Sequence, residues 1–188
     1  GMQNVVTGTD VILLQLEIPL ETVKAAIFAA KSEGKLVILN PAPAAFLDEE
    51  ILRRTDILTP NETELEFLSG HRTDTLENIK AAGAILLEKG VKDLVITLGS
   101  RGALHMNRSS AAHYDAYRVN AVDTTAAGDS FNAALAVSLS EGKTMEEAIG
   151  FAMKVGAMTV TKEGAQPSLP LLEEVNHFDQ WIKHHTKS

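Results

Sequence analysis

The sequence predicts an α/β protein with a three-layer α/β/α arrangement, in which helices cover both faces of a mainly parallel sheet. Short apolar runs of strand length alternate with longer helical patterns, and glycine or proline marks most of the boundaries. Such strands are buried on both faces, and their alternation with helices is typical of a parallel sheet. Ligands of these folds bind at the carboxyl ends of the strands, so we expect the functional site there.

The first half of the chain supplies the parallel strands and the helices between them. Continuous apolar runs predict strands over residues 11–16, 36–39, 56–59 and 94–98. Helical patterns are predicted over residues 20–31, near 51–52, from the N-cap at 61 to about 70, and over 75–88. Gly34, Gly70 and Gly90 follow three of these helices, as expected for helix ends.

The second half begins with a different pattern. Residues 103–122 read as short antiparallel strands around the polar turn at 107–110, which places a hairpin at one edge of the sheet. Helices are predicted over residues 127–140 and 145–160, with a break at Gly142, and a final amphipathic helix over 171–184. Since no repeat or linker interrupts the chain, we expect one α/β domain over residues 1–188.

Composition and charge exclude several classes of function. The chain is 45% hydrophobic and 22% charged, as in an ordinary globular protein. Its net charge of −8 and the lack of a basic stripe argue against binding nucleic acid or a membrane surface, so we expect small-molecule partners. The absence of cysteine rules out disulfides and thiolate metal sites and fits a cytoplasmic location. The six histidines show no metal-ligand spacing, and we expect them to be solvated.

The most informative segment is residues 122–132, which place a carboxylate in a small-residue loop that opens into a helix. Ala126, Ala127 and Gly128 lack bulk, so their N–H groups can approach an anion at the positive end of the helix. Asp129 follows directly and is suited to take the proton from an attacking hydroxyl. This arrangement suits phosphoryl transfer. The same pattern also fits a simple turn and N-cap before an amphipathic helix.

Further motifs follow the predicted strands in a defined order. They are Asn-Glu-Thr-Glu at residues 61–64, Thr-Leu-Gly-Ser-Arg-Gly at 97–102 and Gly-Ala-Gln-Pro-Ser at 164–168. Together with segment 122–132, they resemble the ribokinase/PfkB carbohydrate kinase family, and the resemblance runs from about residue 11 to the C-terminus. Leu-Gln-Leu-Glu at 14–17 and Asn-Pro-Ala-Pro-Ala at 40–44 are similar to the ribokinase branch of that family.

The resemblance implies an ATP-dependent sugar kinase that transfers the γ-phosphoryl group of ATP to the primary hydroxyl of ribose or a similar sugar. It implies that Asp129 is the catalytic base and that the N–H groups of Ala126, Ala127 and Gly128 form an anion hole. Ala126 stands where the family commonly has glycine, and alanine is harmless there only if the residue has a negative φ.

The resemblance also implies a nucleotide and magnesium site. Asn61 and Glu64 match a motif that organises Mg²⁺ and phosphate through water, although an N-cap with a solvated glutamate gives the same pattern. Thr97, Gly99 and Gly102 match the nucleotide-phosphate loop, although such glycines often serve only a tight turn. Met153 would lie beside adenine, although a methionine at helical spacing is often plain core.

A monovalent-cation site and a sugar site follow from the same resemblance. The expected cation is K⁺, held mostly by backbone carbonyls at Asp123, Thr125, Thr159, Lys162, Gly164 and Ser168; Asp123 also fits a loop-bonding or capping aspartate. Glu17 and Asn40 match sugar-contacting positions at the ends of two strands, where polar residues also often just face solvent.

The resemblance covers only the C-terminal, nucleotide-binding portion of such an enzyme. The family's N-terminal portion supplies the first strands, a Gly-Gly-Asn motif, an early sugar-binding aspartate and a β lid, and we find none of these before Val11. We therefore expect an unpaired sheet edge at residues 11–16 and self-association, for example as a homodimer. Two other interpretations remain open: a catalytically silent remnant that binds nucleotide or self-assembles, and a PfkB kinase for another sugar, a nucleoside or a sugar phosphate.

Overall fold

The computed structural model describes residues 10–124, 126–162, 170 and 172–186. The chain divides into two compact units, which are taken in turn. The sheet unit comprises residues 10–99 and 103–114, and the helical unit comprises 115–188 together with 100–102. The prediction of a single domain stays a prediction.

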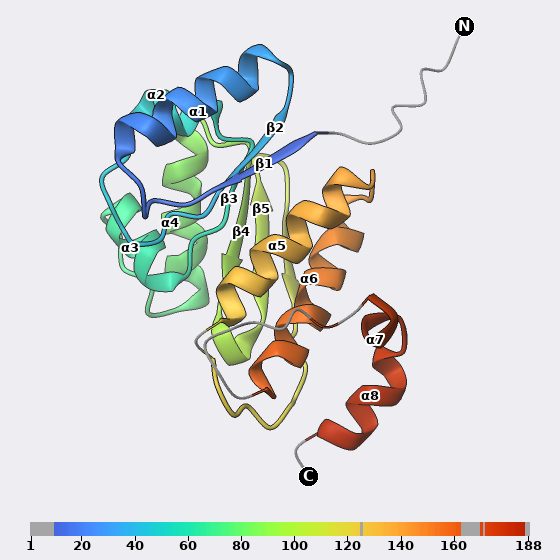
Figure 1. Cartoon of the computed structure of the whole chain (residues 1–188). Helices are drawn as coiled ribbons and strands as arrows, with labels where there is room; N and C mark the ends of the chain where they lie inside the picture. Colours follow the sequence, from blue (N-terminus) through green and yellow to red (C-terminus); the bar gives the residue numbers. More distant parts are fainter. Residues whose placement is uncertain (1–9, 125, 163–169, 171, 187–188) are drawn as a thin grey trace, which may run out of the picture. The chain divides into compact units, whose positions relative to one another are not determined.

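In the described part of the chain, six strands form one sheet in sequence order (Figure 1). The strands are β1 (Val11–Leu14), β2 (Leu36–Leu39), β3 (Ile57–Leu58), β4 (Asp93–Thr97), β5 (Ala103–Asn107) and β6 (Ala111–Tyr114). Strands β1 to β4 pair in parallel, and β4, β5 and β6 pair antiparallel. The predicted mainly parallel sheet with a hairpin at one edge is therefore confirmed. Among the described residues, β1 is the other outer strand and ends two residues earlier than predicted.

Helices of the sheet unit cover one face of this sheet (Figure 1). They are α1 (Leu20–Ser32), α2 (Glu49–Arg54), α3 (Glu62–Ser69) and α4 (Leu76–Glu88). Ile27 of α1 and Leu86 of α4 share a core with Leu39 and other side chains that alternate along the strands. Ile38 and Val95 point to the opposite face and are also fully buried. Side chains of β2 and β4 are thus buried on both faces of the sheet.

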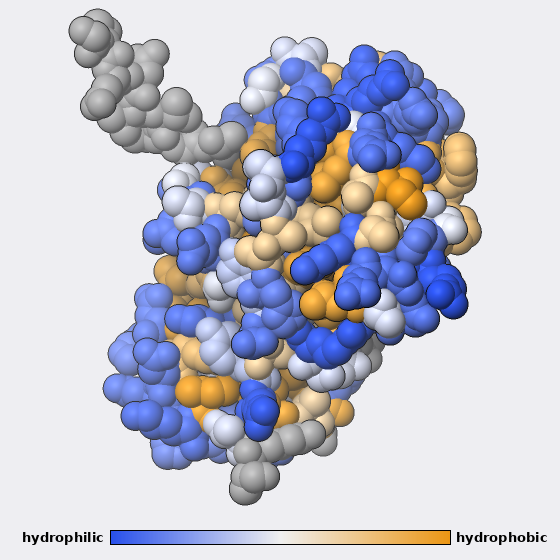
Figure 2. All heavy atoms as spheres, turned by 180° about the vertical axis from the view of Figure 1, so that it is seen from behind, coloured by the Kyte–Doolittle hydropathy of each residue, from blue (hydrophilic) through white to orange (hydrophobic). Residues whose placement is uncertain are grey.

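The helical unit contains α5 (Ala127–Ser140) and α6 (Met145–Val160), which pack against each other. Both helices have the predicted bounds, and Gly142, with a φ of 80°, lies in the turn between them. No helix among the described residues is long and apolar enough to span a membrane. The apolar side chains on the face shown in Figure 2 occur in separate patches between hydrophilic ones.

The predicted final helix over residues 171–184 is wrong, because two short helices, α7 (Leu172–Asn176) and α8 (Phe178–His185), occupy this region. The helix is interrupted at His177, whose φ and ψ are −99° and 22°. Phe178 follows the break and is buried, with its ring 4.5 Å from that of Tyr117 and 5.4 Å from that of Trp181. Burying the ring of Phe178 is worth about 1.5–3 kcal/mol, and this free energy outweighs the cost of interrupting the helix.

The expectation that the histidines are solvated is also wrong for His105 on β5. Its Nε2 lies 2.7 Å from Oδ1 of Asp93 on β4, and the His105 side chain is only 13% exposed. The strand register opposes Val95 to His105 and Asp93 to Asn107, so this pair lies diagonally across two neighbouring strands. Such a contact depends on the register and has no local signal in the sequence.

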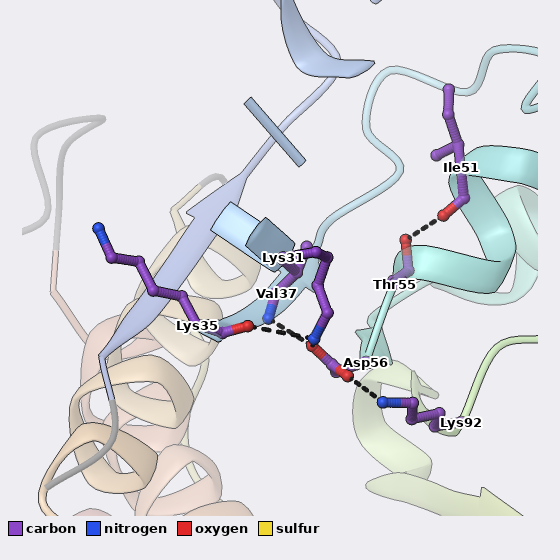
Figure 3. Close-up of polar contacts among 7 residues, drawn as sticks. All are labelled: Lys31, Lys35, Val37, Ile51, Thr55, Asp56 and Lys92. Atoms are coloured by element: carbon purple, nitrogen blue, oxygen red, sulfur yellow. Dashed lines mark hydrogen bonds and ion pairs between the residues drawn. The ribbon is translucent and has the colours of Figure 1, made fainter. Parts of the chain in front are cut away.

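A buried carboxylate, that of Asp56, links the amino ends of β2, β3 and β4 with the carboxyl end of α1 (Figure 3). Its Oδ2 accepts hydrogen bonds from Nζ of Lys31 at 2.7 Å and from the N–H of Val37 at 2.8 Å. Its Oδ1 accepts from Nζ of Lys92, also at 2.7 Å. Burial by itself would raise the pKa of Asp56, but the two lysines and the Val37 N–H outweigh burial and hold that pKa below its ordinary value.

We predict that Asp56→Asn lowers the free energy of unfolding by about 1.5–3 kcal/mol at pH 7, because bonds to a charged acceptor are lost. Since the folded-state pKa is depressed, this stabilisation is complete above the ordinary Asp pKa of about 4. It is lost as the pH falls through the lower pKa of the folded state. Urea unfolding of both proteins across the acid range measures the difference.

The matched control is Glu49→Gln, which removes the charge of a carboxylate that pairs with Arg53 on the exposed surface. This change should leave the stability nearly unchanged. An Asp56→Asn variant as stable as the unaltered protein at pH 7, or a difference that persists unchanged under strongly acidic conditions, would contradict the role given to Asp56.

Candidate functional site

The carboxyl ends of β1 and β2 lie together and carry the two predicted sugar-site residues. The N–H of Asn40 donates to the carbonyl of Leu14 at 2.8 Å, and the N–H of Leu16 donates to the carbonyl of Ala42 at 3.0 Å. Asn40 directly follows β2 and is 6% exposed, whereas Glu17 lies in the bend after β1 and is exposed. The structure therefore places both residues on neighbouring loops at the edge of the sheet where α/β proteins bind ligands.

The next two strands bring two of the predicted nucleotide-site segments together. Asn61 follows β3 and forms an isolated parallel bridge with Thr97, the last residue of β4. The N–H of Thr97 donates to the carbonyl of Pro60 at 3.0 Å. The Asn-x-x-Glu and Thr-x-Gly motifs are thus neighbours at the carboxyl ends of β3 and β4, although Asn61 and Thr97 are 36 positions apart in the sequence.

Asn61 and Glu64 form a capping box at the start of α3. Oδ1 of Asn61 accepts from the N–H of Glu64 at 2.8 Å, and Oε2 of Glu64 accepts from the N–H of Asn61 at 2.9 Å. The burial of Glu64 raises the pKa of its carboxyl group more than the Asn61 N–H lowers it. The box engages one oxygen of each side chain, so a capping role leaves room for a ligand-binding role at Oε1 of Glu64 and Nδ2 of Asn61.

The loop from β4 to β5 needs both of its glycines for conformational reasons. Gly99 has a φ of 57° and Gly102 a φ of 93°, and both values lie in the left-handed region that glycine adopts most easily. Gly99 opens a short 3₁₀ turn over Gly99–Arg101, and a Cβ added to it would meet open space. The turn itself therefore accounts for the glycine at 99, and the phosphate-binding role of the loop stays a prediction.

The backbone of the small-residue loop before α5 has the negative φ that alanine needs at position 126. Ala126 is the N-cap of α5 and has a φ of −100°, so alanine is accommodated where glycine is common in the family. Asp129 lies in the first turn of α5 and is exposed, as is Gly128. A carboxylate in this position is stabilised by the positive end of the helix. The N–H of Ala127 donates to the carbonyl of Thr124 at 3.2 Å.

Part of the predicted cation site lies where this loop meets the end of α6. The N–H groups of Val122 and Asp123 both donate to the carbonyl of Val160, at 2.7 and 3.1 Å. Thr159 is 5% exposed, and its hydroxyl donates to the carbonyl of Val155 at 2.8 Å. The structure thus brings Asp123 close to the end of α6.

The remaining members of the predicted set are placed less fully. Nζ of Lys162 lies 3.8 Å from Oε2 of Glu174, and Met153 is half-buried on α6. The predicted positions outside the described residues are Thr125, Gly164 and Ser168.

Two residues of this region were missed by sequence reasoning, namely Ser130 and Asn132. They are 1% and 3% exposed, and their side chains bond back to carbonyl groups of the N-cap and the first turn of α5. The hydroxyl of Ser130 donates to the carbonyl of Ala126, and Nδ2 of Asn132 donates to the carbonyl of Gly128, each at 2.9 Å. The available signal was a polar residue four positions after Ala126 and another four positions after Gly128, where a side chain can bond back to a carbonyl of the preceding turn.

These features define the class of the protein as an α/β protein with polar residues at the carboxyl edge of a mainly parallel sheet and an anion-loop motif before a helix. A comparison with protein families then identifies the family. Residues 2–172 match the model of the pfkB family carbohydrate kinases, and the chain belongs to this family.

Individual relatives agree with this assignment. The chain is 41% identical to the ribokinase of Staphylococcus aureus strain COL over 93% of its own length and 58% of the relative's. It is 43% identical to the deoxyribokinase of Salmonella typhi, over 90% of its own length and 56% of the relative's. The chain thus spans little more than half the length of the curated relatives it matches.

A solved structure shows the same fold. The ribokinase of Arabidopsis thaliana complexed with ribose and ATP superimposes with a TM-score of 0.86 at 37% identity. The match covers 89% of this chain and 55% of that one. The predicted ribokinase-like α/β fold is therefore confirmed.

Proposed function

We propose that this chain carries the nucleotide-binding portion of an ATP-dependent sugar kinase that phosphorylates the primary hydroxyl of ribose or a closely related pentose. The observation that carries the proposal is the start of α5, where Asp129 lies in the first turn behind a small-residue loop, in a chain of the pfkB family. The family members that bind or are named for ribose and deoxyribose share the primary hydroxyl as the acceptor that this chemistry needs.

In the proposed reaction, Asp129 removes the proton of the acceptor hydroxyl while its oxygen attacks the γ-phosphorus of ATP. The bond between the γ-phosphorus and the bridging oxygen breaks, and ADP leaves. The N–H groups of Ala126, Ala127 and Gly128 stabilise the charge on the transferred group, aided by the helix N-terminus; that of Ala127 would exchange its 3.2 Å bond to the Thr124 carbonyl for one to the phosphoryl group. A positioned general base contributes about 10²–10⁴-fold to such a step. Asp129 is an exposed residue in the first turn of α5.

The remaining nucleotide contacts are proposed for residues of the strand ends and of α6. We assign phosphate contacts to Asn61, Thr97, Gly99 and Gly102 and an adenine contact to Met153. The neighbouring placement of Asn61 and Thr97 supports this, because both would approach one phosphate chain. We assign sugar contacts to Glu17 and Asn40.

We propose that residues of this chain hold the two ions that the family resemblance implies. Among the described residues, no three His, Asp or Glu side chains gather closely enough to hold a metal ion. Mg²⁺ suits such a site, because it commonly binds one carboxylate, water and substrate phosphates, and Glu64 would provide the carboxylate. When bound, Mg²⁺ neutralises phosphate charge. We propose K⁺ near Asp123 and Thr159, with mainly backbone carbonyl ligands.

The alternative is a catalytically silent protein that binds nucleotide, and one observation favours keeping it. The chain spans only 58% and 56% of the two curated relatives, and turnover depends on holding the acceptor hydroxyl in near-attack geometry. We therefore propose that the chain binds MgATP but phosphorylates ribose slowly by itself. We also propose a single domain and a cytoplasmic location.

We propose further that β1 mediates self-association. Its four residues are all half-buried, and Ile12 and Leu14 pack against the core. Strand β1 pairs on one side with β2. A short apolar strand at the edge of a sheet offers unpaired N–H and C=O groups to a second copy. A twofold dimer that pairs two β1 strands would satisfy these groups on both copies.

The first prediction from this function is that the chain binds MgATP and that Asp129→Asn leaves the affinity within about twofold. Asp129 acts on the acceptor proton, so its replacement should remove whatever ribose turnover the chain supports. Isothermal titration calorimetry measures the affinity, and a coupled ADP assay measures turnover. No heat with MgATP from a folded sample would refute the nucleotide site, and unchanged turnover in Asp129→Asn would remove this residue from the base role.

The second prediction concerns the edge strand. Light scattering at increasing protein concentration should show a dimer or larger species, and Leu13→Lys on β1 should shift the protein towards the monomer. The matched control is Ala112→Lys on β6, the opposite outer strand, where the same charge should leave the association unchanged. A monomer at high concentration, or equal effects of the two lysines, would rule out pairing through β1.

A further inference from the structure

A shallow pocket lies at the amino end of β4, the opposite end of this strand from Thr97. It has a volume of about 450 Å³. The strand register places Asp93, at the start of β4, opposite Asn107, at the end of β5, so two distant segments of the sheet unit meet there. The carboxylate of Asp93 bonds to Nε2 of His105, and Asp93 is not among the lining residues. These lining residues are Gly90, Val91, Lys92, Asn107, Arg108 and Ser109.

The residues that line this pocket carry positive charge. Two of them are basic and none is acidic, although the whole chain has 25 acidic residues against 17 Lys and Arg. Lys92 shares the carboxylate of Asp56 with Lys31, so two positive charges oppose one negative charge. Arg108 forms no ion pair with any described residue, and its Nη2 lies 3.5 Å from the carbonyl of Leu87. The pocket therefore has an excess of positive charge and attracts anions.

The side chain of Asn107 points to a ligand independently of charge, whereas basic residues near the carboxyl end of α4 would stabilise that helix even without one. Oδ1 of Asn107 accepts hydrogen bonds from the backbone N–H and the hydroxyl of both Ser109 and Ser110, at 2.9–3.0 Å. These bonds fix the plane of the amide, and its Nδ2 has no hydrogen-bond partner among the described residues. A half-buried amide thus holds two N–H donors at the pocket, where a ligand oxygen can accept them.

The wall of the pocket that follows α4 is fixed by backbone contacts. The N–H of Gly90 donates to the carbonyl of Leu87 at 3.1 Å, and the N–H of Val91 donates to that of Leu86 at 3.3 Å. Gly90 has a φ of 114°, and a Cβ added to it would lie 2.5 Å from Cγ of Arg53. A ligand therefore does not have to order this wall when it binds, which favours binding.

We propose that this pocket binds a small phosphate monoester, at a site separate from the nucleotide site proposed above. The guanidinium of Arg108, the ammonium of Lys92 and the amide of Asn107 present N–H donors that suit terminal phosphate oxygens. Asp56 accepts one of the three N–H groups of Lys92, which leaves two for the ligand. A phosphate monoester carries about −1.5 to −2 charges at pH 7, more than a single carboxylate, and so matches the positive charge better. A volume of about 450 Å³ also has room for the organic part of such a molecule.

Backbone amide NMR during titration of the whole chain with glycerol 3-phosphate tests the site. We expect saturable shifts centred on Lys92, Ser109 and Ser110, and weaker binding of succinate, which carries its charges on carboxylates. Asn107→Asp keeps the Oδ1 acceptor but replaces the two N–H donors by a charged oxygen, so it should weaken glycerol 3-phosphate binding by at least about tenfold. Arg108→Gln removes the guanidinium charge and should weaken this binding by about tenfold.

The matched control is Arg72→Gln, which removes an exposed arginine of the same unit that does not line the pocket. This change lowers the net charge by the same amount as Arg108→Gln. It should leave glycerol 3-phosphate binding unchanged.

Absence of saturable shifts at the pocket, or equal weakening by Arg72→Gln and Arg108→Gln, would overturn the proposal. Shifts confined to Asn61 and Ala127 would place the phosphate in the nucleotide site instead and would also overturn it. Succinate binding as tight as that of glycerol 3-phosphate would overturn the assignment to phosphate. Should Asn107→Asp fail to fold, Arg108→Gln decides by the same comparison, because Arg108 is exposed.

Discussion

The bonds to the carboxylate of Asp56 are the interaction on which the arrangement of the sheet unit depends. Strand β3 is only two residues long, so few ladder hydrogen bonds fix its register against β2 and β4. Asp56 directly precedes β3 and adds a bond to the N–H of Val37 on β2, while Lys31 reaches it from α1 and Lys92 from the residue before β4 (Figure 3). A slip of one residue would turn Ile57 and Leu58 to the wrong faces, and it would also break these bonds.

This constraint at the amino ends of the strands matters for the opposite ends. The strands are short and parallel, so fixing their starts also fixes where they stop. Asn40, Asn61 and Thr97 lie at these stops, and the bridge between Asn61 and Thr97 exists only in this register. The sheet unit thus places the ion pairs of Asp56 at the amino ends of the strands, while polar residues that can face a ligand lie at the carboxyl ends.

The starts of α3 and α5 differ in the residue at the N-cap. Asn61 caps α3 and keeps Glu64 in a defined position, so stability and the proposed ion site use the same two residues. At α5 the N-cap is Ala126, and the side chains of the buried Ser130 and Asn132 bond to the carbonyls of Ala126 and Gly128.

The sequence alone predicted most of the local structure. The bounds of α5 and α6, the alternation of strands and helices, and the position of Asn61 at a helix start all follow from periodicity and capping preferences. Contacts between distant residues were not predictable: Lys31 and Lys92 lie 25 and 36 positions from Asp56, and the pairing of His105 with Asp93 depends on strand register. The break before Phe178 was hidden because the amphipathic pattern continues through it.

We propose that this chain binds nucleotide through residues at the carboxyl ends of the strands and at the start of α5. Backbone amide NMR during titration with MgATP tests this proposal. We expect the largest shifts at Asn61, Glu64, Thr97 and Ala127. Shifts confined to the amino end of the sheet unit, where Lys92 and Arg108 line a shallow pocket, would contradict it.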